Sequence, residues 1–229
     1  MQYSSHLKIK VYNLNKALFK KYGKQGWWPT ISEAGKAPVY YPGQEGRVVS
    51  DKECFEIIVG SILTQNTSWS NVEKALINLS KENFIDLGKI AKANNDLEIL
   101  IKPAGYFNQK SQRLRVIADN IIKIGGIKAF RKIPTRRLRN LLLSWKGIGP
   151  ETADSILCYA LNKPVFVVDN YTKRLFSKID ILFNSYDQIQ DLVHQSIAPQ
   201  SSEYGDFHAR IVNLFKKKEV EEFLLNFKM

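Results

Sequence analysis

The chain has 229 residues, of which 44% are hydrophobic and 11% aromatic. This composition can bury a core and excludes an intrinsically disordered protein. The 34 lysines and arginines outnumber the 22 acidic residues and give a formal net charge of +12. That charge favours a polyanionic partner, but it equally suits a basic surface kept for solubility. Only Cys54 and Cys158 are present, so a four-cysteine iron–sulfur cluster and a disulfide framework are excluded and a reducing compartment is expected.

Targeting and metal-binding patterns are weak throughout the sequence. No apolar run reaches the roughly 20 residues that span a bilayer, and residues 1–10 lack the apolar centre of a secretory signal. The three histidines, His6, His194 and His208, do not have the spacing of metal ligands. We therefore expect a soluble, cytoplasmic protein that makes no membrane contact.

The predicted elements, in chain order, are almost all helices. An N-terminal helix precedes a loop-like stretch over residues 28–46, where prolines and glycines interrupt any period. From Cys54 onward apolar residues recur at helical spacing, within residues 55–63, 72–79, 97–101, 114–122, 138–145 and 153–161. Residues 165–168 form a short β-branched and aromatic run that predicts an extended connector, and two or three further helices follow over 189–215. The fold class is all-α with short connections.

The segment Leu141–Asp154 contains two helices joined by a short turn that is built on Gly147 and Gly149. Glycine permits a positive φ and lets backbone N–H groups approach an anion, while Pro150 pre-sets the first turn of the next helix. The free amides of that turn suit a phosphate. An ordinary connection between helices is the alternative, and a dinucleotide fingerprint is disfavoured because a helix precedes the glycines. The basic residues nearby favour a DNA backbone as partner, namely Lys146, Arg136, Arg137 and Arg139.

Asp169 ends the extended connector at a position typical of a helix N-cap, and a plain cap is its simplest interpretation. It lies eighteen positions after Glu151 (169 against 151). The pairing of Leu-x-x-x-x-Gly-Ile-Gly-x-x-Thr-Ala with Val-Val-Asp resembles the helix-hairpin-helix DNA glycosylases typified by endonuclease III. The resemblance implies a two-lobed, all-α fold with the active-site cleft between the lobes, and it makes Asp169 the catalytic residue.

The same resemblance implies a domain organisation and a set of DNA contacts. One lobe of six helices would span residues 49–163 and end in the hairpin, and a second helical lobe would be built from residues 1–48 and 164–229. In the family the hairpin grips the phosphate backbone, which implies that role for Lys146, Gly147, Gly149 and Thr152. It also commonly holds a monovalent cation, Na⁺ or K⁺, through main-chain carbonyls, here those of Leu143, Trp145 and Ile148. No other cofactor is expected, and no iron–sulfur cluster.

The implied reaction is intelligible from the chemistry of the side chains. Breaking an N-glycosidic bond builds oxocarbenium-like charge on the sugar, which an anion such as Asp169 stabilises directly or by orienting a water. Bifunctional members of the superfamily carry a lysine just before the Thr152 position, and that lysine attacks the sugar and leads to strand cleavage. This chain has Glu151 there. A carboxylate forms no Schiff base, so a monofunctional enzyme is expected.

Two further stretches of sequence carry a closer resemblance. Leu63-Thr-Gln-Asn-Thr67 is similar to the superfamily segment whose glutamine wedges into the duplex behind the extruded base, which makes Gln65 the wedge candidate; a polar residue that ends a helix is the alternative. Over about residues 27–216 the chain resembles the endonuclease III-like 3-methyladenine DNA glycosylases. The matching segments are Gly26-Trp-Trp-Pro-Thr30, Phe55, Leu63–Thr67, Gly105-Tyr-Phe-Asn-Gln-Lys110, Lys146-Gly-Ile-Gly149 and Asp206-Phe-His208.

In that subfamily aromatic residues form the pocket for an alkylated base. The resemblance therefore implies a pocket role for Trp27, Trp28 and Phe55, and His208 is placed near them, although it equally suits a core position. N3- and N7-alkylated purines carry positive charge, and an aromatic face attracts a cation by roughly 0.5–2 kcal/mol. Arg210 stands where the subfamily can place a lysine, so a pocket role at that position is not expected.

The function expected from these patterns is a monofunctional DNA glycosylase of base excision repair that releases alkylated purines (3-methyladenine-like) and leaves an abasic site. One alternative is an endonuclease III-like glycosylase for oxidised or mismatched bases, with or without abasic-site lyase activity. Another is a helix-hairpin-helix module that binds DNA without catalysis. In each case the expected partner is damaged double-stranded DNA, and we expect a monomer associated with the nucleoid.

Overall fold

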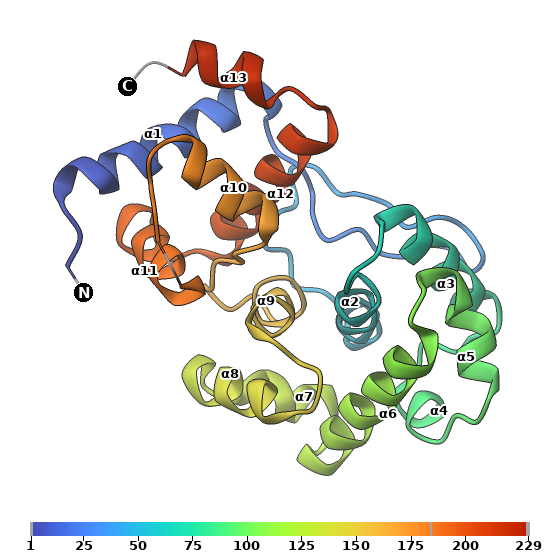
Figure 1. Ribbon diagram of the computed structural model, residues 1–229. Coiled ribbons are helices and arrows are strands. Elements are labelled where there is room, and N and C mark those ends of the chain that lie inside the picture. Colours follow the sequence, from blue (N-terminus) through green and yellow to red (C-terminus); the bar gives the residue numbers. More distant parts are fainter. Residues whose placement is uncertain (1, 184, 228–229) are drawn as a thin grey trace. The chain divides into compact units, whose positions relative to one another are not determined.

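The computed structural model describes residues 2–183 and 185–227. Regular structure in these residues is helical, apart from an isolated antiparallel bridge between Thr30 and Val39. Figure 1 shows the helices in chain order. The all-α prediction is confirmed. None of the helices in the described ranges has the length and apolarity that a bilayer span requires.

The chain divides into two compact units. Unit 1 comprises Met1–Trp27, Tyr41–Arg47 and Asn162–Met229, and unit 2 comprises Trp28–Tyr40 and Val48–Leu161. The adjacent tryptophans therefore belong to different units, since Trp27 ends a segment of unit 1 and Trp28 begins a segment of unit 2. The predicted lobe boundaries, residues 49–163 against 1–48 and 164–229, stay a prediction.

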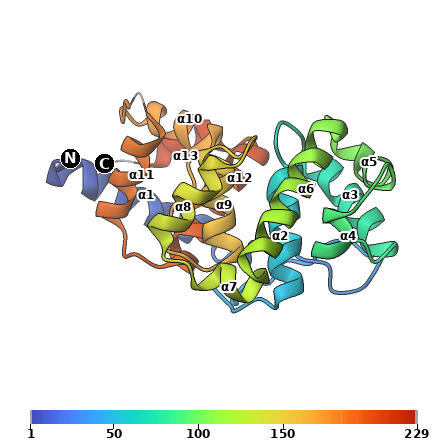
Figure 2. The same cartoon turned by 90° about the horizontal axis from the view of Figure 1, so that it is seen from below.

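Unit 2 is built around helix α2 (Asp51–Leu63). Ser50 and Glu53 form a capping box at its start, with reciprocal hydrogen bonds of 3.2 and 2.9 Å. Every residue from Cys54 to Leu63 is buried, as expected for a helix that is covered on all sides. Its neighbours in the unit (Figure 2) are α3 (Trp69–Lys81), α6 (Phe107–Ile124), α7 (Gly126–Lys132), α9 (Pro150–Ser155) and the π-helical turn Ile156–Ala160.

The remaining elements of unit 2 are short and complete its helical shell. They are α4 (Leu87–Ala91), α5 (Asp96–Ile101), the 3₁₀ turn Lys102–Ala104 and α8 (Thr135–Ser144). Helices α8 and α9 pack together and form the predicted hairpin, with Pro150 at the first position of α9. Helix α9 runs directly into the π-helical turn, so the second helix of the hairpin extends to Ala160.

Unit 1 contains α1 (Ser5–Tyr22), α10 (Asn170–Lys178), α11 (Tyr186–Ser196), α12 (Ser201–Lys216) and α13 (Val220–Asn226). Helix α1 packs on α11 and α12, and α10 packs on α12. Arg210 of α12 is fully buried and donates to Asp206 Oδ2 (2.8 Å) and to Asn15 Oδ1 (2.9 Å) of α1. Its guanidinium also lies 5.2 Å from the ring centre of Phe19. Arg210 therefore ties α1 to α12 in the interior of the unit.

Residues 165–168 form a connector outside any helix, and Asp169 at its end has an extended backbone with φ −96° and ψ −176°. The prediction of a connector at this position is confirmed. Within the described residues the connector's backbone pairs with no strand, and side chains of α11 supply hydrogen-bond partners instead. Phe166 N donates to His194 Nε2 (3.0 Å), and Gln190 Nε2 donates to Phe166 O (2.6 Å). Val168 N donates to the hydroxyl of Tyr186 (3.2 Å). These bonds fix the path of the chain up to Asp169.

Candidate active site

Asp169 lies at the junction of the connector and α10, and its carboxylate is oriented by hydrogen bonds. Oδ1 accepts from Thr172 N (2.7 Å) and from Thr172 Oγ1 (2.8 Å), so Asp169 is the N-cap of α10. The second oxygen, Oδ2, lies 3.5 Å from His208 Nε2 of α12. Asp169 is 9% exposed. The cap therefore uses one carboxylate oxygen and leaves the other on the side of His208.

The environment of Asp169 favours its ionised form. Burial, the largest single cause, raises the pKa of this carboxyl group. The hydrogen bond and charge of His208 and the two hydrogen bonds from Thr172 together outweigh burial, so the pKa lies below its ordinary value. A buried carboxylate that stays ionised is what stabilisation of a developing cation requires.

Trp27 extends the site within unit 1 through its contact with His208. The indole and imidazole meet edge to face, with ring centres 5.9 Å apart and an angle of 84°. The ammonium of Lys216, the last residue of α12, lies 5.7 Å from the ring centre of Trp27. Asp169, His208, Trp27 and Lys216 thus form one continuous set of contacts. Of the predicted pocket residues, the structure brings Trp27 and His208 into contact, and His208 also faces the carboxylate.

The turn of the hairpin matches the prediction at Gly147 and departs from it at Gly149. Gly147 has φ +87°, the left-handed region that favours glycine. Gly149 has φ −94° and ψ 177°, an extended conformation open to any residue. A Cβ at Gly149 would meet nothing within 4 Å. Neither backbone conformation nor internal packing therefore requires glycine at position 149.

The basic residues near the hairpin divide into exposed and paired ones. Lys146, Arg136 and Arg137 are exposed. Arg139, grouped with them in the sequence analysis as favouring DNA, instead donates to both carboxylate oxygens of Asp154 (2.7 and 3.1 Å), and Asp154 is fully buried. Arg139 thus joins α8 to α9 across the turn. Because its charge is paired with Asp154, Arg139 adds less to the basic surface around the hairpin than the exposed side chains do, and its association with DNA stays a prediction.

Glu151 and the predicted cation ligands lie around the same turn. Glu151 is exposed on the first turn of α9, where the helix macrodipole favours an acid. Trp145 O accepts a hydrogen bond from Ile148 N (3.1 Å) and so closes the turn. Together with Leu143, these two residues supply the carbonyls of the predicted monovalent-cation site, which stays a prediction. The described residues contain no cluster of three or more His, Cys, Asp and Glu side chains suited to a metal ion.

Gln65 follows the C-terminus of α2, and its amide lies on the hairpin turn. Nε2 donates to Gly147 O (3.1 Å) and to Thr152 Oγ1 (2.9 Å). Oε1 accepts from Arg113 of α6. The structure thus places the wedge candidate against two of the residues predicted to contact the DNA backbone.

Trp28 belongs to an aromatic cluster in unit 2 that the sequence analysis did not identify. Its ring centre lies 5.6 Å from that of Trp69 and 5.2 Å from that of Tyr159. Its indole packs on Gly60 of α2, where a Cβ would come within 3.1 Å of Nε1. The sequence does offer a signal for Trp69, because this residue lies two positions after the Leu63–Thr67 segment. No signal marked Tyr159, whose contact depends on the fold alone.

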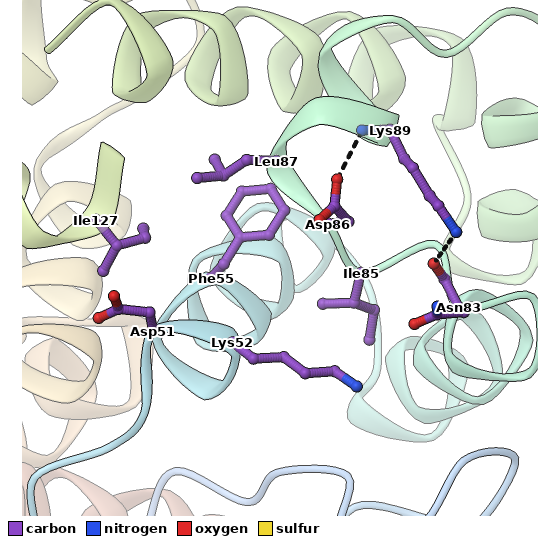
Figure 3. A pocket seen from close by; sticks show the side chains of 9 residues that line it. All are labelled: Asp51, Lys52, Phe55, Asn83, Ile85, Asp86, Leu87, Lys89 and Ile127. Atoms are coloured by element: carbon purple, nitrogen blue, oxygen red, sulfur yellow. Dashed lines mark hydrogen bonds between the residues drawn. The ribbon is translucent and has the colours of Figure 1, made fainter. Parts of the chain in front are cut away.

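Phe55 does not join this cluster. It is buried and lines a pocket with Ile85, Leu87 and Ile127 (Figure 3), to which neither Trp28 nor Tyr159 contributes. At 3.6 residues per turn, positions 55 and 60 of α2 point about 140° apart. The base-pocket role of Phe55 stays a prediction, and the residue that packs beside Trp28 is Trp69.

Comparison with known proteins places these features in a family. The sequence model described as "HhH-GPD superfamily base excision DNA repair protein" matches residues 59–199. The chain is 38% identical over 213 residues to "Putative DNA repair glycosylase MJ1434" of Methanocaldococcus jannaschii, which covers 90% of this chain and 87% of the relative.

Solved structures agree with this assignment. A 3-methyladenine DNA glycosylase of H. pylori (MagIII), crystallised with 1,N6-ethenoadenine, has a TM-score of 0.73 and 31% identity, covering 91% of this chain and 98% of that one. An endonuclease III–DNA complex has a TM-score of 0.68 at 16% identity, covering 90% and 85%, and shows the shared fold. The chain belongs to the HhH-GPD superfamily and is a DNA glycosylase of base excision repair.

Proposed function

We propose that this glycosylase hydrolyses the N-glycosidic bond of alkylated, 3-methyladenine-like purines in double-stranded DNA and stops at the abasic site. The observation that carries the substrate class is the 31% identity over 91% of the chain with a protein named as a 3-methyladenine DNA glycosylase. The side chains described above support the proposal through three kinds of contact: to the sugar, to the base and to the DNA backbone.

Asp169 is the group proposed to act at the sugar. As the glycosidic bond lengthens, positive charge spreads over the deoxyribose ring oxygen and C1′. A carboxylate held ionised by Thr172 and His208 stabilises that charge more in the transition state than in the ground state. It acts directly on the cation or by orienting the attacking water. Alkylation at N3 or N7 already weakens the bond, so no additional covalent catalyst is needed.

Aromatic side chains are proposed to bind the base. Trp27 lies beside His208 in unit 1, and Trp28 lies with Trp69 and Tyr159 in unit 2. The electron-rich faces of indoles attract a cationic, alkylated purine by roughly 0.5–2 kcal/mol, depending on how completely water is removed. An uncharged base would lack this attraction. The aromatic groups therefore favour charged lesions over normal bases.

Glu151 is the reason to expect that the strand stays intact. Strand cleavage in the bifunctional members proceeds through an amine that attacks C1′ and forms a Schiff base. A carboxylate on the first turn of α9 cannot form that intermediate. The product is then a free base and an unbroken strand with an abasic site.

The hairpin turn and Gln65 are proposed to hold the DNA. Gly149 is exposed, and a Cβ built there would meet nothing within 4 Å. This free space suits the close approach of a phosphate to the backbone amides of α9. The exposed Lys146 adds charge. Gln65 is proposed to fill the space left when the damaged nucleotide is extruded.

A panel of duplexes, each with one lesion, tests this proposal. The panel contains 3-methyladenine, 7-methylguanine, 8-oxoguanine and a G·T mismatch, and released bases are separated by chromatography. We expect release of the two alkylated purines, with strand breaks only after alkali treatment. Release from the oxidised or mismatched duplex alone would overturn the proposed substrate class, and strand cleavage without alkali would overturn the proposed stop at the abasic site.

A further inference from the structure

Helix α6 reaches the segment that carries Gln65 with two basic side chains. The first is Lys110, which is 1% exposed and donates through Nζ to Leu63 O and Ala104 O, both at 2.8 Å. Leu63 is the last residue of α2, so its carbonyl is one of those that a helix leaves without an internal partner. Lys110 therefore fixes the backbone from which Gln65 projects.

The second side chain is Arg113, three positions further along α6. Its Nη1 donates to Gln65 Oε1. The stem of the same arginine lies over Gly147, where a Cβ would come within 2.8 and 2.9 Å of Arg113 Cδ and Cγ. Arg113 thus contacts both the wedge candidate and the turn of the hairpin. Gly147 is constrained twice, by its positive φ and by this contact.

The orientation of the Gln65 amide follows from these partners. A glutamine side chain carries one acceptor oxygen and one NH₂ group. Arg113 offers only donors and binds the oxygen, while Gly147 O and Thr152 Oγ1 lie 3.1 and 2.9 Å from the nitrogen. Both ends of the amide are therefore matched in one orientation only. Without Arg113 the oxygen loses its donor on α6, and the amide is no longer restricted to the orientation that points its nitrogen at the hairpin.

We propose that Arg113 is a positioning residue for Gln65. It fixes the Gln65 side chain relative to the hairpin turn, so that Gln65 enters the base stack at a set distance from the phosphates that the hairpin binds. This inference rests on the proposed wedge role of Gln65. Loss of Arg113 then impairs extrusion of the damaged nucleotide while binding of DNA persists. The competing account makes Arg113 a direct phosphate contact, whose loss weakens DNA binding whether or not Gln65 is present.

A double-mutant cycle separates these accounts. Arg113→Met keeps the stem and removes the guanidinium, and it is combined with Gln65→Ala. For each protein we would measure single-turnover base release at saturating enzyme, the Kd for duplex DNA over a range of salt, and fluorescence of a 2-aminopurine next to the lesion, which reports unstacking. Lys123→Met, an exposed residue at the other end of α6, controls for loss of one positive charge.

We expect Arg113→Met to lower base release about tenfold, to reduce the 2-aminopurine signal and to leave Kd within about twofold, while Lys123→Met matches the wild type. The double mutant should be no slower than Gln65→Ala alone. The proposal would be overturned if the fold-reductions in base release of the two single mutants multiplied in the double mutant. It would also be overturned if the slope of log Kd against log salt concentration fell by about one in Arg113→Met.

Arg113→Lys provides a second test in case the methionine variant does not fold. It keeps the charge but lacks the planar fork, so extrusion should remain impaired while Kd is retained; full recovery of base release would contradict a positioning role. Binding and 2-aminopurine fluorescence need no base release. If the wild type released no alkylated base, the proposed function would fail, yet the coupling between Arg113 and Gln65 would still be measured.

Discussion

Glu56 is a buried carboxyl group beneath the loop that follows Trp28, and replacing it with glutamine should change how the stability of the protein depends on pH. It is 3% exposed, and its Oε1 accepts a hydrogen bond from Ile31 N (2.6 Å). Burial, the largest cause, raises its pKa from the ordinary 4.5 to about 7. Glutamine keeps an oxygen for Ile31 N but has no proton to lose.

The sign and size of the effect follow from linkage. Between pH 4.5 and about 7 the folded protein keeps a proton on Glu56 that the unfolded chain has lost. The stability from this group is therefore fully present below pH 4.5 and is lost as the pH rises through about 7. The shift corresponds to about 3 kcal/mol in the free energy of unfolding.

Urea denaturation at about pH 4.5 and pH 8 measures this difference. We expect the stability of Glu56→Gln relative to the wild type to increase by about 3 kcal/mol between the two pH values. Glu33→Gln, an exposed carboxylate of the same loop, is the matched control and should not show the increase. A stability difference between Glu56→Gln and wild type that is the same at both pH values would refute the reasoning.

Three further predictions concern the hairpin and the Trp28 cluster. Arg139→Met removes the ion pair with the fully buried Asp154, so the free energy of unfolding in urea should fall by about 3 kcal/mol. Gly60→Leu drives a side chain into the indole of Trp28, and single-turnover release of alkylated bases should fall while DNA binding, measured by fluorescence anisotropy, persists. Glu151→Lys restores an amine at the start of α9, and borohydride should trap a covalent protein–DNA adduct with this variant and none with the wild type.

Each of these predictions has a result that contradicts it. Wild-type stability of Arg139→Met would mean that the ion pair with Asp154 adds nothing to the stability of the hairpin. Unchanged base release by Gly60→Leu would remove Trp28 from base binding. A borohydride adduct with the wild-type protein would show that an amine other than one at position 151 attacks the sugar, and the proposed stop at the abasic site would be wrong.

The sequence predicts the helices well because their signals are local. Ser50 and Glu53 lie three apart, as a capping box requires, and both hydrogen bonds are present. Pro150 begins α9. The connector before Asp169 is too short for a helical period, and it contains no helix. In each case the deciding interaction lies within a few residues of the chain, where spacing and backbone preference suffice.

The site is predicted less completely, because its contacts join distant segments. The resemblance implies a base-pocket role for Phe55, which stays a prediction. Because α2 is buried on all sides, periodicity cannot tell which of its faces meets Trp28. The basic sequence around the hairpin groups Arg139 with Lys146, Arg136 and Arg137. Its ion pair with Asp154 is not visible from the sequence, because Asp154 lies across the turn. Arg113 gave no signal, since its contact with Gln65 spans 48 positions. These pairings depend on the packing of helices, which residue spacing does not encode.

The central claim is that the Asp169 carboxylate drives base release, and its replacement by asparagine tests this most directly. Asparagine keeps an oxygen for Thr172 N and Thr172 Oγ1, so α10 should remain capped and the protein folded. Single-turnover release of 3-methyladenine from duplex DNA is the measurement, with Kd for the same duplex recorded in parallel. We predict that release falls at least about a hundredfold while Kd is retained. Release by Asp169→Asn at the wild-type rate would contradict the account.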